Sequence, residues 1–155
     1  MGAATGRARV GLASGLATAL ILALPAVAQN APEAALGPEG TFGAVIPVPS
    51  GQEVWWVDAT QTEEGPQGLT YPFRFLAPQI GGVGALSPEV ALLDIAALCE
   101  TYVAPRLPQG GAPQPEQVVL SLSDRIVPLG ETAPEAVQYF EAYSVSDGVC
   151  EWEFF

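Results

Sequence analysis

The amino-acid sequence predicts an α+β fold: an antiparallel sheet of four or five strands packed on one main α-helix, with one disulfide. Three observations predict it. Residues 69–77 and 117–124 alternate in side-chain character, which is typical of strands. Residues 87–103 place apolar side chains at helical spacing. The chain of 155 residues contains two cysteines, Cys99 and Cys150, and its length is that of a single domain.

Residues 1–28 have the pattern of a cleavable signal peptide. Arg7 and Arg9 precede an apolar run over 10–24, and Ala26, Val27 and Ala28 supply a small-residue cleavage site. The run is about 15 residues long, whereas a membrane-spanning helix needs roughly 20. We therefore expect export, cleavage near Ala28, a periplasmic or secreted mature protein, and no stable membrane insertion afterwards.

The next segment, residues 29–50, is rich in Ala, Pro, Gly and Glu, and we interpret it as flexible. A single α+β domain is then expected over 51–155. Its first strand is predicted over 53–58, and its second over 69–77, with Tyr71, Phe73 and Phe75 on one face. Together these two strands suggest an antiparallel hairpin.

The main helix is predicted to begin at Ser87 and to end at about Tyr102 or Val103. A hydroxyl residue, a proline and an acid in succession are typical of a helix start. Pro105 stops the helix. Arg106 follows the C-terminal end, where a cation is favoured, so its simplest role is structural.

The C-terminal third predicts three more strands. In the strand over 117–124, alternation points Val118, Leu120 and Leu122 to the core. Residues 135–146 fit either a helix or a strand, and the hairpin signal Asp147-Gly148 favours a strand that returns over 149–155. A two-residue turn pairs Val145 with Cys150 and Tyr143 with Trp152. The side chains then predicted to face inward are Cys150, Trp152 and Phe154, and this register brings Glu141 uncomfortably close to the core.

Charge and composition exclude several function classes. The chain carries five basic and 17 acidic residues, a net charge of −12, and has no histidine or lysine. Losing Arg7 and Arg9 with the signal peptide leaves three basic and 17 acidic residues, a net charge of −14. Such a chain repels nucleic acid and anionic lipid, and it is compatible with cationic or neutral partners. The simpler interpretation of the acidity is solubility or adaptation to salt. Without histidine or lysine, the common nucleophile systems and histidine-based zinc or copper sites are excluded, and we expect no cofactor.

The two cysteines are expected to form a disulfide, because an even number of cysteines in an exported protein favours one. Cys99 lies on the predicted inner stripe of the helix and Cys150 on the predicted inner face of the last strand. The alternative is a redox pair, which the absence of a Cys-x-x-Cys motif disfavours.

Two groups of residues are candidate ligand or partner contacts. The first contains Ser123, Asp124 and Arg125, with Glu141 on the next strand, where carboxylates beside an arginine suit a polar ligand. The other interpretation is an ordinary ion pair at the end of a strand. The second group is Trp55 and Trp56, which point to opposite faces of one strand. No residue is assigned as catalytic or as a metal ligand, because no loop has the acidic spacing of a calcium site.

The chain also resembles a known family in four segments: 98–107, 113–125, 140–143 and 147–152. These segments are similar to a domain-of-unknown-function family of short exported proteins from alphaproteobacteria. The resemblance implies that both cysteines and the Ser-Asp-Arg segment belong to the common framework of the domain, and it implies no activity. We expect a non-catalytic binding or interaction module in the periplasm, with an unknown protein or small-molecule partner. The alternative is a small hydrolase that uses carboxylate or serine chemistry around Asp124 and Glu141.

Overall fold

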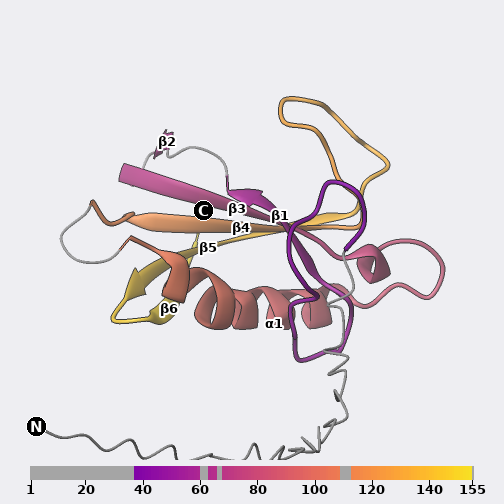
Figure 1. The fold of residues 1–155 in the computed structure, drawn as a ribbon, viewed down its shortest axis with the longest axis horizontal. Coiled ribbons are helices and arrows are strands. Elements are labelled where there is room, and N and C mark those ends of the chain that lie inside the picture. Colours follow the sequence, from indigo (N-terminus) through magenta and orange to yellow (C-terminus); the bar gives the residue numbers. More distant parts are fainter. Residues whose placement is uncertain (1–36, 60–62, 66–67, 109–112, 155) are drawn as a thin grey trace, which may run out of the picture. The chain divides into compact units, whose positions relative to one another are not determined.

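The computed structural model describes residues 37–59, 63–65, 68–108 and 113–154 (Figure 1). All of them belong to one unit, Glu33–Phe155. The predicted signal peptide, 1–28, and residues 29–36 of the predicted flexible segment lie outside the described residues.

A single mixed sheet contains every strand of the described chain. The strands are β1 (Trp55–Ala59), β2 (Glu63–Gly65), β3 (Gly68–Leu76), β4 (Gln117–Ser123), β5 (Gln138–Ser146) and β6 (Val149–Glu153). Their order in space is β1-β3-β4-β5-β6, and the short β2 pairs with β3. Five of them match the strands predicted from the sequence, including the ambiguous segment that forms β5.

The sheet is not wholly antiparallel, because β3 and β4 are parallel neighbours, from Thr70 opposite Gln117 to Leu76 opposite Ser123. The prediction of an antiparallel sheet is wrong at this one pair. A parallel pair needs a crossover that carries the chain back to the end of the sheet where the first strand began. Helix α1 (Pro88–Leu98) lies between β3 and β4 in the sequence and makes that return.

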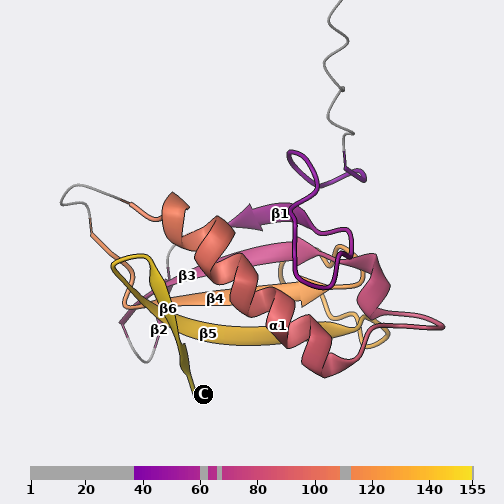
Figure 2. The same ribbon diagram turned by 90° about the horizontal axis from the view of Figure 1, so that it is seen from below.

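Helix α1 lies across one face of the sheet (Figure 2). Ser87 is its N-cap and Pro88 its first residue, as predicted. A π-helical turn (Cys99–Val103) and a 3₁₀ turn (Ala104–Arg106) continue it, and another 3₁₀ turn (Pro78–Ile80) follows β3. Arg106 Nη1 donates to the carbonyl oxygen of Tyr102 at 2.8 Å, which caps the helical segment at its C-terminal end.

The core lies between α1 and the sheet. Alternation along the strands and the helical stripe supply most of the buried side chains; the core includes Ile46, Val54, Phe73, Phe75, Ile80, Ile95, Leu98, Val103, Leu107, Val118, Leu120, Leu122 and Tyr143. The opposite face carries a smaller cluster of Trp55, Val57 and Leu76 against Ile126. The sheet is therefore covered on both faces near β1.

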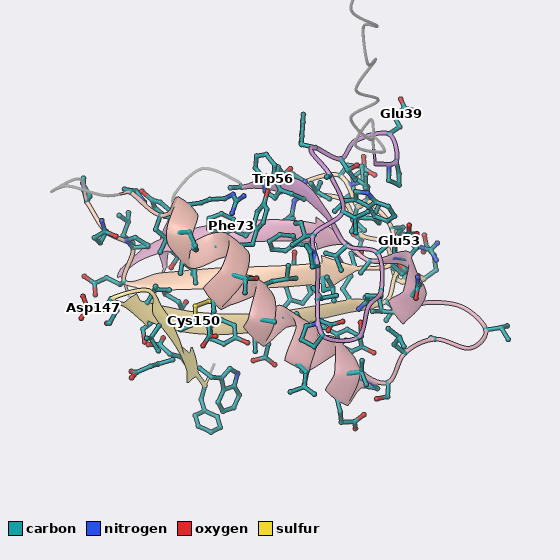
Figure 3. The ribbon with its side chains drawn as sticks, turned by 60° about the horizontal axis from the view of Figure 1, so that its bottom comes forward. Glu39, Glu53, Trp56, Phe73, Asp147 and Cys150 are labelled. Atoms are coloured by element: carbon teal, nitrogen blue, oxygen red, sulfur yellow. A yellow bond between two sulfur atoms is a disulfide. The ribbon has the colours of Figure 1, made fainter. Side chains whose placement is uncertain are left out.

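Cys99 and Cys150 form a disulfide, with Cα atoms 6.2 Å apart (Figure 3). It joins the buried inner side of the helical segment to β6 and confirms the predicted bridge. The predicted hairpin register is also confirmed, since Val145 lies opposite Cys150 and Tyr143 opposite Trp152. Asp147 and Gly148 have φ angles of 51° and 80°, the conformation that favours this dipeptide in a two-residue turn.

Residues 42–52, which we name the strap, pack against β1 and α1. The amide of Phe42 donates to the carbonyl oxygen of Trp56 at 2.8 Å, and the amide of Ile46 donates to the carbonyl oxygen of Val54 at 2.8 Å. The side chain of Ile46 is 7% exposed and belongs to the core. Packing in the described chain therefore begins before residue 51, the predicted start of the domain, and flexibility over 29–50 stays a prediction.

One buried carboxylate connects the strap to the helix. Asp94 of α1 is fully buried and accepts hydrogen bonds from the Ser50 amide (2.9 Å), the Ser50 hydroxyl (2.5 Å) and Gln52 Nε2 (2.6 Å). No basic side chain of the described residues forms an ion pair with it. The strap thus satisfies a buried charge with hydrogen-bond donors alone.

Candidate functional site

A groove runs between α1 and the strands β5 and β6, with a volume of about 590 Å³. We name it the acidic groove. The residues that line it are Glu89, Leu92, Leu93, Ala96, Glu141, Tyr143, Cys150 and Trp152. On the helix they form two rows of residues four apart, 89 with 93 and 92 with 96, which project on the same side. On the strands, the pairing of Tyr143 with Trp152 places the other wall.

The outer wall of the acidic groove is aromatic and open to solvent. Trp152 is 50% exposed, and its ring lies 4.2 Å from that of Phe154, which is 81% exposed. Leu93 is 65% exposed on the opposite wall. The prediction that Trp152 and Phe154 face inward is therefore wrong about burial: both side chains are exposed. These side chains lie on the helix side of the sheet. However, β6 contacts the helical segment at the turn Cys99–Val103, and the C-terminal part of the strand extends beyond the helix, so the helix does not cover it.

Glu141 lies on the same side of β5, half-buried, and its carboxylate accepts a hydrogen bond from the indole Nε1 of Trp152. This contact accounts for the acid that the predicted register brought close to the core. The carboxylate sits at the open side of the acidic groove, where it orients the tryptophan, and it is not enclosed by apolar side chains alone.

Two further groups define the electrostatics of the groove. Burial and, to a smaller extent, the charge of Glu141 together raise the pKa of the Tyr143 hydroxyl to about 12. The backbone amide of Glu89 and then the Ser87 hydroxyl lower the pKa of the Glu89 carboxyl. Glu89 is therefore an anion at neutral pH, and Tyr143 is a neutral phenol.

The segment Ser123, Asp124 and Arg125 makes structural contacts. The Asp124 carboxylate accepts from Arg125 Nε and Nη2, both at 3.0 Å, and from the Val137 amide at 3.2 Å. The hydroxyl of Ser123, which is 7% exposed, donates to the Arg125 carbonyl at 2.6 Å. These bonds hold the end of β4 to the start of β5, as expected of an ion pair that ends a strand.

Asp124 and Glu141 are not brought together. Glu141 lies opposite Leu120, four residues before Asp124, and four residues of strand span about 13 Å. The two predicted tryptophan contacts are also covered: Trp55 is 7% exposed in the smaller cluster, and Trp56 is half-buried with its ring centroid 5.5 Å from that of Phe42. A role for any of these residues in binding stays a prediction.

Sequence reasoning missed Trp152, Leu93 and Glu89 as surface candidates. It also passed over Asp94, because an acid inside a helical stripe has no signature of burial. One signal was present for Trp152. The predicted pairing placed a carboxylate beside the aromatic end of β6, and an acid at that position indicates an open site.

The described residues contain no cluster of three or more cysteine, aspartate or glutamate side chains placed to hold a metal ion. Within the same ranges, none of the helices has both the length and the apolar character that crossing a bilayer requires.

Comparison with known proteins gives one result. Neither a curated protein nor a solved structure matches the chain. Residues 20–155, most of the chain and including the acidic groove, do match a family of unknown function, and the protein therefore belongs to that family, DUF6497.

Proposed function

We propose that this protein is an exported, non-catalytic binding module that holds a cationic amphipathic segment of a partner protein in the acidic groove. One observation carries the proposal: the groove combines solvent-exposed apolar side chains with two carboxylates and, among its described lining residues, no basic side chain. Such a surface matches a peptide that carries apolar and basic residues on one side.

The apolar part supplies the anchor. A tryptophan is a rigid side chain with a large apolar area, and tryptophans are enriched among the residues that dominate binding energies. Trp152 is held in place by Glu141 and Phe154, so little side-chain entropy is lost when a partner covers it. Leu93, on the other wall, offers a second apolar contact.

Charge supplies the selectivity. Glu89 and Glu141 lie beside the apolar walls, so a lysine or arginine of the partner meets a carboxylate as its apolar neighbours enter the groove. The net charge, −12 for the whole chain and −14 without residues 1–28, attracts cationic partners from a distance and repels nucleic acid. Both effects weaken with salt, because the Debye length falls to about 8 Å at physiological ionic strength.

The alternative, a hydrolase around Asp124 and Glu141, has less support. The strand register separates the backbone positions of the two residues by about 13 Å, which is long for a catalytic pair whose carboxyl groups must lie roughly 6.5–9.5 Å apart, as in inverting glycosidases. Both carboxylates already accept hydrogen bonds from neighbouring side chains. If a substrate screen finds hydrolysis, Asp124→Asn and Glu141→Gln should abolish it, and full activity in both variants excludes this assignment.

Export is part of the proposal. A disulfide between Cys99 and Cys150 is stable in a periplasm or outside the cell and rare in a reducing cytosol. The predicted signal peptide over 1–28 supplies the route. Detection of the protein in the periplasmic fraction, with its N-terminus just after Ala28, tests this part.

Binding is tested with a synthetic amphipathic peptide of leucine and lysine, labelled for fluorescence anisotropy, and a matched peptide in which glutamate replaces lysine. We expect saturable binding of the lysine peptide that weakens as salt is added, and no binding of the glutamate peptide. Trp152→Ala should weaken binding about tenfold or more. Equal affinity for the two peptides contradicts the proposal.

Two matched controls locate the site. Phe140 is 52% exposed on the opposite face of β5, and Phe140→Ala should leave the affinity unchanged. Glu100 is exposed but does not line the groove, so Glu89→Gln should weaken peptide binding more than Glu100→Gln does. If both control variants weaken binding as much as the groove variants, the peptide binds through general charge and not at this site.

A further inference from the structure

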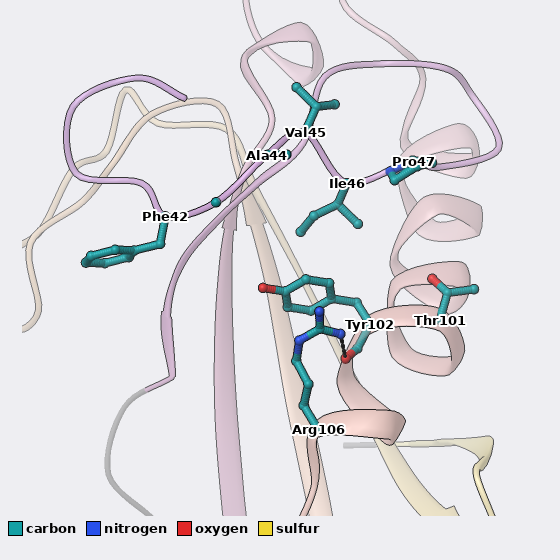
Figure 4. Close-up of a pocket in the computed structure, with 9 residues that line it drawn as sticks. Phe42, Ala44, Val45, Ile46, Pro47, Thr101, Tyr102 and Arg106 are labelled. Atoms are coloured by element: carbon teal, nitrogen blue, oxygen red, sulfur yellow. Dashed lines mark hydrogen bonds between the residues drawn. The ribbon is translucent and has the colours of Figure 1, made fainter. Parts of the chain in front are cut away.

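A second cavity lies between the strap and the C-terminal end of the helical segment (Figure 4). Its volume is about 490 Å³, within the usual range of small-molecule sites. The lining residues are Phe42, Gly43, Ala44, Val45, Ile46 and Pro47 of the strap, with Thr101, Tyr102 and Arg106 opposite. We name it the strap pocket. It shares no lining residue with the acidic groove.

Arg106 is held in a fixed orientation inside this pocket. The central carbon of its guanidinium lies 3.6 Å from the centroid of the Tyr102 ring, and Nη1 donates to the Tyr102 carbonyl at 2.8 Å. Figure 4 shows the guanidinium stacked on the ring, with Ile46 approaching from the strap. A guanidinium has five N–H donors, so the cap at Tyr102 leaves donors for a ligand. Stacking orients them in advance.

The charge of Arg106 is not neutralised by any described residue. Arg74 forms an ion pair with Asp58, and Arg125 forms one with Asp124, whereas Arg106 forms none within the part of the chain that the structure describes. An exposed cation without a carboxylate is unexpected in a chain with 17 acidic residues. Among its described lining residues, the strap pocket therefore has one positive charge, that of Arg106, and no negative charge.

The walls around this charge are apolar. Ile46 is buried, while Phe42 and Val45 are 59% and 37% exposed at the mouth of the pocket. An apolar body with one anionic head complements these groups: the head pairs with the guanidinium fork and the body covers the strap side chains. The net charge of −12 disfavours ligands with several negative charges, because long-range repulsion grows with ligand charge while a single arginine attracts one group.

We propose that the strap pocket binds a small free carboxylic acid with an apolar body, as its monoanion. The carboxylate pairs with Arg106, and the body packs against Phe42, Val45 and Ile46. This site is independent of the peptide-binding function proposed for the acidic groove, so either proposal can fail without the other.

The test uses three probes of similar length: octanoate, octanol and octylammonium. Each is titrated into ¹⁵N-labelled protein, and affinities come from amide chemical shifts. Octanoate is expected to shift the amides of residues 42–46, 101–104 and 106 and to bind about tenfold or more tightly than octanol, the gain of a charge-assisted bond. Octylammonium should bind more weakly than octanol. Equal binding of octanoate and octanol, no binding of octanoate, or shifts confined to the acidic groove overturns the proposal.

Variants at Arg106 identify the charge as the cause. Arg106→Lys keeps the charge but loses the stacked fork, so it should retain only part of the preference for octanoate over octanol, and Arg106→Gln should abolish that preference. Because Arg106 also caps the helical segment, the melting temperature of each variant is measured alongside. Arg106→Glu should reverse the ligand preference, so that this variant binds octylammonium more tightly than octanoate. Damage to the fold would weaken both ligands and could not produce this reversal. If the preference for octanoate persists in Arg106→Glu, the ligand is not paired with this residue.

Discussion

Replacing Asp94 with asparagine tests how the strap is held. The substitution keeps the shape of the side chain and removes its charge. In the native protein both carboxylate oxygens accept hydrogen bonds, Oδ1 from the Ser50 amide and Oδ2 from the Ser50 hydroxyl and the Gln52 amide group. Asparagine can place only one oxygen there, so its NH₂ group must face either the Ser50 amide or the side-chain donors of Ser50 and Gln52. Asp94 and Gln52 are buried, whereas Ser50 is exposed and can turn to solvent.

The magnitude follows from these contacts. A hydrogen bond to a charged group contributes about 1.5–3 kcal/mol, and a buried donor left unpaired costs about 1–3 kcal/mol. Asparagine also avoids the desolvation cost of the buried charge, which offsets part of the loss. We therefore expect Asp94→Asn to lower the free energy of unfolding by about 2–4 kcal/mol, a large part of the roughly 5–15 kcal/mol that domains possess.

The assay is urea unfolding followed by circular dichroism, together with amide hydrogen exchange. Glu100→Gln, the same chemical change at an exposed position of the helical segment, should shift stability by no more than about 0.5 kcal/mol. Exchange of the Ile46 amide, which donates to Val54, should accelerate in Asp94→Asn because the strap loses its attachment. A stability change no larger than that of the control, or unchanged exchange at Ile46, refutes the reasoning.

Three further predictions concern stability. Replacing Cys99 and Cys150 together with alanine should lower the free energy of unfolding by about 4 kcal/mol, because the bridge spans a sequence separation of 51 residues; a loss below about 1 kcal/mol in urea titrations contradicts this. The Tyr143 pKa of about 12 lies above the ordinary value near 10, so the stability it contributes is complete below pH 10 and is lost as pH rises toward 12, on the order of 1–3 kcal/mol. Melting temperatures across this interval should show the loss in wild type and in Tyr139→Phe but not in Tyr143→Phe. Arg74→Ala should cost about 1–2 kcal/mol in the same unfolding assay, because Arg74 pairs with Asp58 and donates to the Val127 carbonyl at 2.6 Å; an unchanged value shows that this partly exposed pair is screened.

Local chemistry made much of the fold predictable. Ser87 and Pro88 start α1 where the sequence predicts, and Asp147-Gly148 sets the β5–β6 register because both residues adopt positive φ. That register, combined with the helical stripe, places Cys150 near Cys99. The helix start and the turn each depend on residues close together in the sequence, and the position of the disulfide follows when these two local features are combined.

The parallel pairing of β3 with β4 was not predictable in this way. Alternation defines the faces of a strand and carries no information about the direction of its neighbour. The candidate site escaped prediction for a related reason. Alternation places Trp152 and Phe154 on the helix side of the sheet, but whether the helix covers that position depends on where α1 crosses β6. The burial of Asp94 likewise depends on Ser50 and Gln52, more than 40 residues earlier in the chain.

The position of β6 at one end of the sheet bears on self-association. Its outer edge faces no other described strand, and an open edge is a template on which a second copy can add its own strand. The strand is five residues long and carries Glu151 and Glu153, and every copy of the chain has the same charge of −12. Repulsion between copies therefore protects this edge at neutral pH. Loss of this repulsion, as in high salt, is expected to expose the edge and the neighbouring aromatic side chains of Trp152 and Phe154 to contact between copies.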